Sequence, residues 1–90
     1  MVTSRVKVIN KNGIHLRLAG ELVKAASKFQ SVITIAKDSQ EVNAKSILGV
    51  AGLGAEYGSE LVITVDGNDE DDALASLVSL IESSFFEGKQ

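Results

Sequence analysis

The chain has 90 residues, which is room for one domain, residues 1–90, built around one hydrophobic core. Its composition is 44% hydrophobic and 23% charged with a net charge of −3, so neither a disordered chain nor a basic nucleic-acid-binding surface is expected. The absence of cysteine and the presence of one histidine exclude a disulfide framework, thiol catalysis and a histidine-rich metal cluster.

The first half of the chain predicts a strand, a helix and a hairpin. Apolar or small residues recur at every second position from residue 2 to residue 8, which predicts a strand with one face turned to the core. A turn at Asn12 and Gly13 follows. Then a stripe at helical spacing begins, formed by Leu16, Ala19, Leu22, Val23, Ala26 and Phe29. The β-branched run 32–36, the turn 38–40 and the segment 41–43 predict a hairpin.

The second half predicts a short helix, a strand and a longer helix. Ser46 precedes a short apolar segment whose helix is weakened by Gly49 and Gly52, each costing about 1 kcal/mol relative to alanine. Residues 61–65 alternate as a last strand. Asn68 is expected to cap the final helix, whose acidic first turn suits the positive end of the helix dipole. The buried stripe of that helix is expected to comprise Leu74, Leu77, Val78, Ile81 and Phe85.

The order of these elements, β-α-β-β-α-β-α, predicts the fold class. It is an α+β two-layer open-faced sandwich, in which helices cover one face of an antiparallel sheet of four strands.

His15 stands where the first helix should begin, a position that ordinarily favours Ser, Thr, Asp or Asn. Departures from such local rules tend to mark functional or strained positions. The N–H groups at a helix start form an anion pocket, and Arg17 adds a guanidinium that can grip a phosphate in two places. An imidazole lone pair beside this pocket is suited to attack phosphorus. From these residues alone, an exposed histidine without a function is the alternative.

Two separated segments resemble the HPr family of histidine-containing phosphocarrier proteins. Residues 13–19, GIHLRLA, resemble the family's active-site motif, and residues 42–50, VNAKSILGV, resemble the segment around its regulatory serine. Residues 25–29 also resemble the end of its first helix. The resemblance implies a phosphocarrier and not an enzyme. Enzyme I, charged by phosphoenolpyruvate, would donate the phosphoryl group, and the A domains of sugar permeases would receive it.

The resemblance also implies a role for each site residue. His15 is the phosphorylated nucleophile, and Arg17 and the backbone N–H groups of Leu16 and Arg17 stabilise the phosphate without a metal or cofactor. Capping of the short helix would by itself explain a serine at position 46. The resemblance implies in addition that Ser46 is phosphorylated for regulation by an HPr kinase/phosphorylase. Partners are expected to dock on a patch beside the histidine that comprises Leu16, Gly20, Ile47 and Leu48.

Leu18 is a departure, because the family usually has proline there. Proline presets φ near a helix start and lacks an N–H group, so leucine loosens that arrangement and adds one donor. This departure supports a second hypothesis, a regulatory paralogue read by a transcription regulator or by a nitrogen-related relay without feeding sugar uptake. A third hypothesis is a generic α+β ligand-binding module with an idle histidine.

The surroundings of the protein are predicted from what the sequence lacks. There is no run of about 18 apolar residues and no secretory signal pattern. We therefore expect a cytoplasmic monomer that neither inserts into a membrane nor binds nucleic acid.

Overall fold

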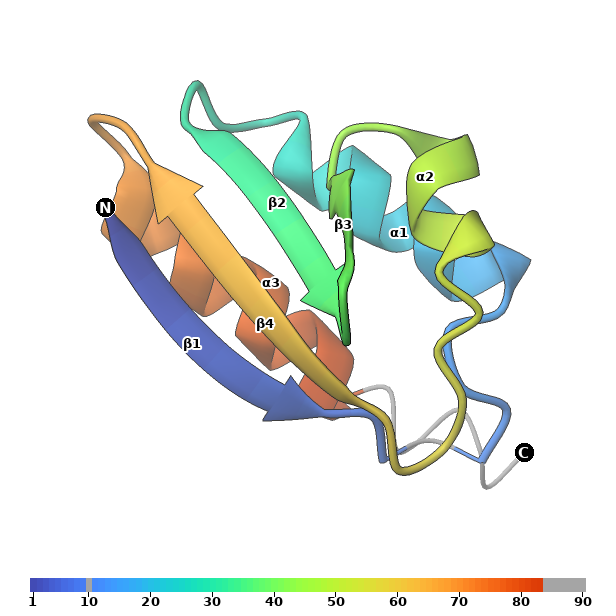
Figure 1. The fold of residues 1–90 in the computed structure, drawn as a ribbon. Coiled ribbons are helices and arrows are strands. Elements are labelled where there is room, and N and C mark those ends of the chain that lie inside the picture. Colours follow the sequence, from blue (N-terminus) through green and yellow to red (C-terminus); the bar gives the residue numbers. More distant parts are fainter. Residues whose placement is uncertain (10, 84–90) are drawn as a thin grey trace.

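The computed structural model describes residues 1–9 and 11–83. The elements follow the predicted order: β1 Val2–Lys7, α1 Leu16–Ala26, β2 Val32–Lys37, β3 Gln40–Asn43, α2 Ile47–Gly52, β4 Glu60–Asp66 and α3 Glu70–Ser83. The strands form one antiparallel sheet in the order β1-β4-β2-β3. Helices α1 and α3 lie behind this sheet, and α2 lies beside α1 (Figure 1). The predicted open-faced sandwich is confirmed.

The core lies between the sheet and the helices. Every second residue of β4 is buried, because alternate side chains of a strand point to the same face. The fully buried large side chains on the strands include Ile33, Ile35, Leu61, Ile63 and Val65. On the helical side they are met by Leu18, Ala19, Leu22 and Ala26 of α1 and by Ala73, Leu77 and Ile81 of α3. Phe85, predicted to extend the stripe of α3, lies outside the described residues.

The buried face of α1 differs from the predicted stripe at its start. Leu16 is 72% exposed, whereas Leu18 is fully buried. At 3.6 residues per turn, Leu18 shares one arc with Ala19, Leu22 and Ala26, and Leu16 lies outside that arc. The helix is therefore rotated so that its first residue faces solvent, and Leu16 is accessible, as its expected place in the docking patch requires.

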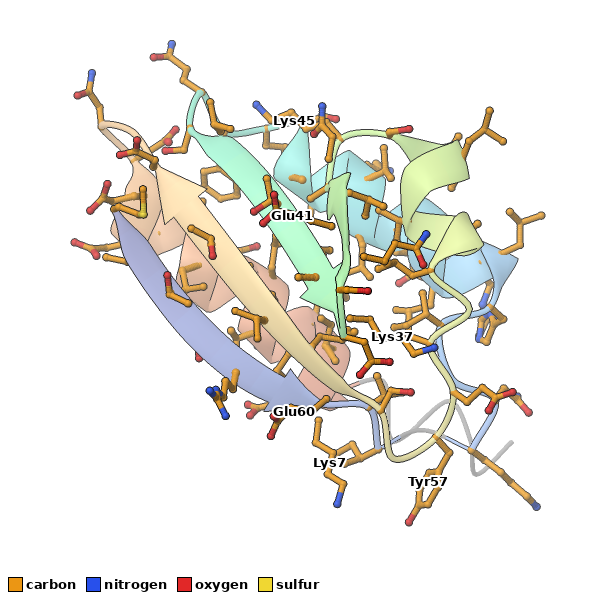
Figure 2. The ribbon with its side chains drawn as sticks, in the orientation of Figure 1. Lys7, Lys37, Glu41, Lys45, Tyr57 and Glu60 are labelled. Carbon is orange, nitrogen blue, oxygen red and sulfur yellow. The ribbon has the colours of Figure 1, made fainter. Side chains whose placement is uncertain are left out.

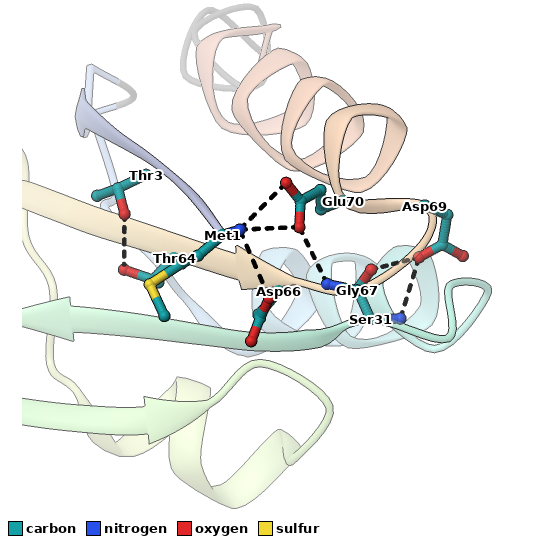
Figure 3. Close-up of polar contacts among 8 residues, drawn as sticks. All are labelled: Met1, Thr3, Ser31, Thr64, Asp66, Gly67, Asp69 and Glu70. Atoms are coloured by element: carbon teal, nitrogen blue, oxygen red, sulfur yellow. Dashed lines mark hydrogen bonds and ion pairs between the residues drawn. The ribbon is translucent and has the colours of Figure 1, made fainter.

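The start of α3 also differs from the prediction, which placed a cap at Asn68. The helix begins at Glu70, and Asn68 lies in the preceding turn. The Asp69 carboxylate accepts hydrogen bonds from the Ser31 N–H at 3.0 Å and from the Ser31 hydroxyl (Figure 3). It also accepts a hydrogen bond from the N–H group of Gln30 at 2.9 Å. These donors lower the pKa of Asp69, the Ser31 hydroxyl most of all. The predicted cap was wrong, because the acidic residue before the helix instead fastens the loop before β2.

No helix in the described ranges, residues 1–9 and 11–83, is long and apolar enough to cross a membrane.

Candidate functional site

The loop that presents His15 is anchored to the loop between α2 and β4. The Ile14 N–H donates to the Ala55 carbonyl at 2.8 Å, and both residues are buried. Gly13 has a φ of +67°, a conformation that favours glycine, and a Cβ there would lie 2.5 Å from the Ala55 carbonyl oxygen. A side chain at residue 13 would therefore push the two loops apart. The position of His15 thus depends on a segment distant in the sequence.

His15 is the N-cap of α1. Its backbone is extended, with φ −84° and ψ 176°, and its Nδ1 accepts a hydrogen bond from the Leu18 N–H at 3.3 Å. Ser, Thr, Asp and Asn make this contact with an oxygen, and a neutral imidazole makes it with the lone pair of a ring nitrogen. The histidine, an unusual residue type for a cap, therefore caps the helix with nitrogen. The residue is half-buried, and its Nδ1 faces the first turn of the helix.

The first turn of α1 is suited to an anion. It carries no acidic side chain, and N–H groups in the first turn point out of the helix start, where the helix dipole is positive. Leu16 and Arg17 supply the first two of these groups. An anion bonded to Nδ1 of His15 would lie at this end of the helix.

Arg17 projects from the same turn and pairs with an acidic side chain of its own helix. Its Nε lies 4.0 Å from Oε2 of Glu21, one helical turn later, and the side chains are 68% and 48% exposed. Exposed ion pairs of this kind contribute ~0.3–0.5 kcal/mol. The pair with Glu21 therefore opposes only weakly a move of the guanidinium toward a phosphoryl group.

Apolar side chains are exposed at the starts of α1 and α2. Leu16 is 72% exposed, Leu48 is 84% exposed and Ile47 is 38% exposed. Gly20 is half-buried, and a Cβ built on it would lie 3.9 Å from Cδ1 of Ile47, so α1 and α2 meet there. We call these four residues the α1–α2 patch. All four predicted docking residues thus lie on α1 and α2, which are neighbours (Figure 1). The side chains of Leu16, Ile47 and Leu48 are exposed.

Ser46 is the N-cap of α2. Its Oγ accepts a hydrogen bond from the Gly49 N–H at 3.1 Å, as the sequence predicts. The preceding residue, Lys45, donates from Nζ to the Phe29 carbonyl at 2.8 Å and so ties the start of α2 to the loop between α1 and β2 (Figure 2). Ser46 is half-buried, and the exposed Ile47 follows it directly.

The far end of α2 is held by Lys37 of β2. Its Nζ donates to the carbonyls of Leu53 at 3.4 Å and Gly54 at 3.3 Å, just after the helix ends (Figure 2). A cation is favoured there by the negative end of the helix dipole. The contacts at both ends therefore stabilise a short helix that its two glycines weaken.

Metal ligation has no support among residues 1–9 and 11–83, where no group of three or more His, Cys, Asp or Glu side chains is placed to hold an ion.

Comparisons with known proteins identify the family of this chain. The family model described as the PTS HPr component phosphorylation site matches residues 2–83. The phosphocarrier protein HPr of Treponema pallidum is 45% identical over 97% of this chain and 99% of its own length. The HPr-like protein Crh of Halalkalibacterium halodurans is 42% identical over 91% of this chain and 98% of its own. The crystal structure of an HPr from Thermoanaerobacter tengcongensis is similar with a TM-score of 0.90 at 43% identity, covering 96% and 97% of the two chains. A family match over this length excludes a generic ligand-binding module, and the chain belongs to the HPr family, the phosphocarriers of the phosphotransferase system.

Proposed function

We propose that Nδ1 of His15 accepts the phosphoryl group from enzyme I and that the chain then passes it to the A domains of sugar permeases. Enzyme I and the A domains are the partners of the HPr family. The observation that carries the choice of atom is the contact between Nδ1 and the Leu18 N–H, which turns this nitrogen toward the start of α1. His15 is also the only histidine of the chain.

The transfer is a nucleophilic substitution at phosphorus. The Nδ1 lone pair forms the new N–P bond, the bond from phosphorus to its donor breaks, and its electron pair stays with the donor. The Nε2 proton of His15 leaves to the donor or to solvent. The phosphoryl oxygens then lie at the N–H groups of Leu16 and Arg17 and within reach of the Arg17 guanidinium, and hydrogen bonds to charged groups contribute ~1.5–3 kcal/mol each.

Incubation with enzyme I and phosphoenolpyruvate tests the assignment of His15. The wild-type protein should acquire one acid-labile phosphoryl group, measured by intact-protein mass spectrometry at neutral and acidic pH. His15→Asn is the matched variant, because its Oδ1 is attached to Cγ as Nδ1 is and can still accept the Leu18 N–H and cap α1. Phosphorylation of folded His15→Asn by enzyme I would contradict the proposal.

Arg17→Ala tests the guanidinium. Transfer should slow more than 10-fold, about 1.4 kcal/mol of barrier, while thermal unfolding changes little because the side chain is exposed. Glu21→Ala is the control, since it breaks the same ion pair and leaves the arginine in place. An equal loss of rate in both variants would mean that the ion pair matters and not the contact with phosphate.

We propose regulation at Ser46 by phosphorylation, with an HPr kinase/phosphorylase as the enzyme and a transcription regulator as a reader. Phosphoserine adds about −1.5 to −2 charges at the N-terminus of α2, where the helix dipole tolerates them, so the fold should persist. The charge lies next to the exposed Ile47 and Leu48, so an apolar partner would have to desolvate it.

Ser46→Asp and Ser46→Asn separate charge from capping, because both residues cap helices and only aspartate is charged. The affinity for enzyme I should fall about 5- to 100-fold in Ser46→Asp, which corresponds to ~1–3 kcal/mol, and remain near wild type in Ser46→Asn. Equal affinities of the two variants would show that a negative charge at residue 46 does not weaken the binding of enzyme I.

A further inference from the structure

The Leu18 backbone N–H lies against the nitrogen that we assign as the nucleophile. Its nitrogen is 3.3 Å from Nδ1 of His15, and this contact forms the cap of α1. The Leu18 side chain is fully buried between α1 and the sheet, so packing holds this part of the backbone in place. Proline at this position would have no N–H to offer.

We propose that the Leu18 N–H changes its hydrogen-bond acceptor during the reaction. It donates to the Nδ1 lone pair in the unphosphorylated protein and to a phosphoryl oxygen after transfer. Leu18 is thus a positioning residue for His15. This inference rests on the proposed function, because it takes Nδ1 as the atom that accepts the phosphoryl group.

In the unphosphorylated protein the contact selects a tautomer. Nδ1 accepts a hydrogen bond only when it carries a lone pair, and in the neutral ring the proton is then on Nε2. The donor therefore holds the ring with its nucleophilic lone pair at the start of α1. At 3.3 Å the bond is longer than the usual 2.9–3.0 Å and is easily given up when phosphorus approaches.

After transfer the same N–H has a better acceptor. The Nδ1 lone pair is then shared with phosphorus, and the charged phosphoryl oxygens on that phosphorus are acceptors for the N–H. Hydrogen bonds to a charged acceptor are roughly twice as strong as those between neutral groups. Exchange of a long neutral bond for a charge-assisted one should favour the phosphorylated form about fivefold, which corresponds to ~1 kcal/mol.

A single-atom change tests this inference without altering any side chain. Chemical synthesis and ligation of the 90-residue chain can replace the Leu18 N–H by an ester oxygen and keep the leucine side chain in the core. Leu18→Pro also lacks the N–H, and Leu18→Ala is its matched control because it retains the N–H and loses most of the buried side chain. The ester protein decides the question even if the two substituted proteins fail to fold.

The first measurement is the tautomer of the His15 ring, read from its 15N chemical shifts in the unphosphorylated protein at alkaline pH. The Nε2–H form should dominate in the wild type and in Leu18→Ala, and its share should fall in the ester protein and in Leu18→Pro. Identical tautomer populations in the wild-type and ester proteins would overturn the inference. This measurement needs no phosphoryl donor.

The second measurement is a competition for phosphoryl groups. Equal amounts of the wild-type and ester proteins are mixed with catalytic enzyme I and limiting phosphoenolpyruvate, and mass spectrometry then measures the phosphorylated share of each. The wild type should hold about five times more. Equal sharing would overturn the change of acceptor by the Leu18 N–H and leave the proposed function intact. No phosphorylation of either protein would refute the proposed function and this inference with it.

Discussion

Truncation of Leu48 separates docking from folding. Its side chain is 84% exposed at the start of α2, so Leu48→Ala removes three carbon atoms that contribute almost nothing to the core. Burial of such atoms under a partner contributes about 0.8 kcal/mol per carbon, and 84% of the sum for three carbons is about 2 kcal/mol. If the α1–α2 patch docks enzyme I, Kd should therefore rise about 10- to 30-fold.

The assay is isothermal titration calorimetry of each variant with enzyme I, accompanied by thermal unfolding. Val32→Ala is the matched control, because Val32 is 68% exposed on β2, outside the α1–α2 patch. The control should change Kd less than about twofold, and neither substitution should alter stability by more than about 0.5 kcal/mol. An unchanged Kd for Leu48→Ala, or an equal rise for Val32→Ala, would refute the assignment of the patch.

Two further predictions concern the loops that hold the fold. Gly13→Ala should destabilise the protein by ~2 kcal/mol or more in urea unfolding, because it combines a φ of +67° with a Cβ 2.5 Å from the Ala55 carbonyl oxygen; a loss below about 0.5 kcal/mol would show that the two loops separate freely. The pKa of Asp69 lies below its ordinary value of 3.8 in the folded protein, chiefly because of the Ser31 hydroxyl, so its contribution to stability is present above that value and is lost as the pH falls through the folded pKa. Asp69→Asn should lower the unfolding midpoint at neutral pH and flatten its decline below about pH 4, and parallel pH profiles for both proteins would contradict this role.

The sequence by itself determined the elements and the family. Alternation along β4 and helical spacing along α3 are local patterns. Each element buries one face, so its apolar residues recur with the period of a strand or of a helix. The segments around His15 and Ser46 are contiguous, so their resemblance to the HPr family is evident from the order of the residues alone. The cap expected at Ser46 and the family expectation for the whole chain are confirmed for the same reason.

Only the tertiary structure decided the rotation of α1. Leu16 and Leu18 both fit a helical stripe in the sequence, and the chain's entry into the helix selects between them. That entry is fixed by the hydrogen bond from Ile14 to Ala55, a partner on a distant loop. The exposed Leu16 then becomes available to partners, and the buried Leu18 places its N–H at the helix start.

The tertiary structure likewise decided which acceptor each polar group found. Asp69 is one of several acidic residues in its segment, and only the approach of the loop before β2 gives its carboxylate the donors of Ser31. The extra donor at Leu18 is evident from the absence of proline, but its acceptor is not, because the imidazole of His15 has two nitrogens and a rotatable side chain. Local propensity specifies which groups can form hydrogen bonds, whereas the packing of distant segments fixes the orientation that pairs them, and in this protein that orientation brings Nδ1 of His15 to the Leu18 N–H.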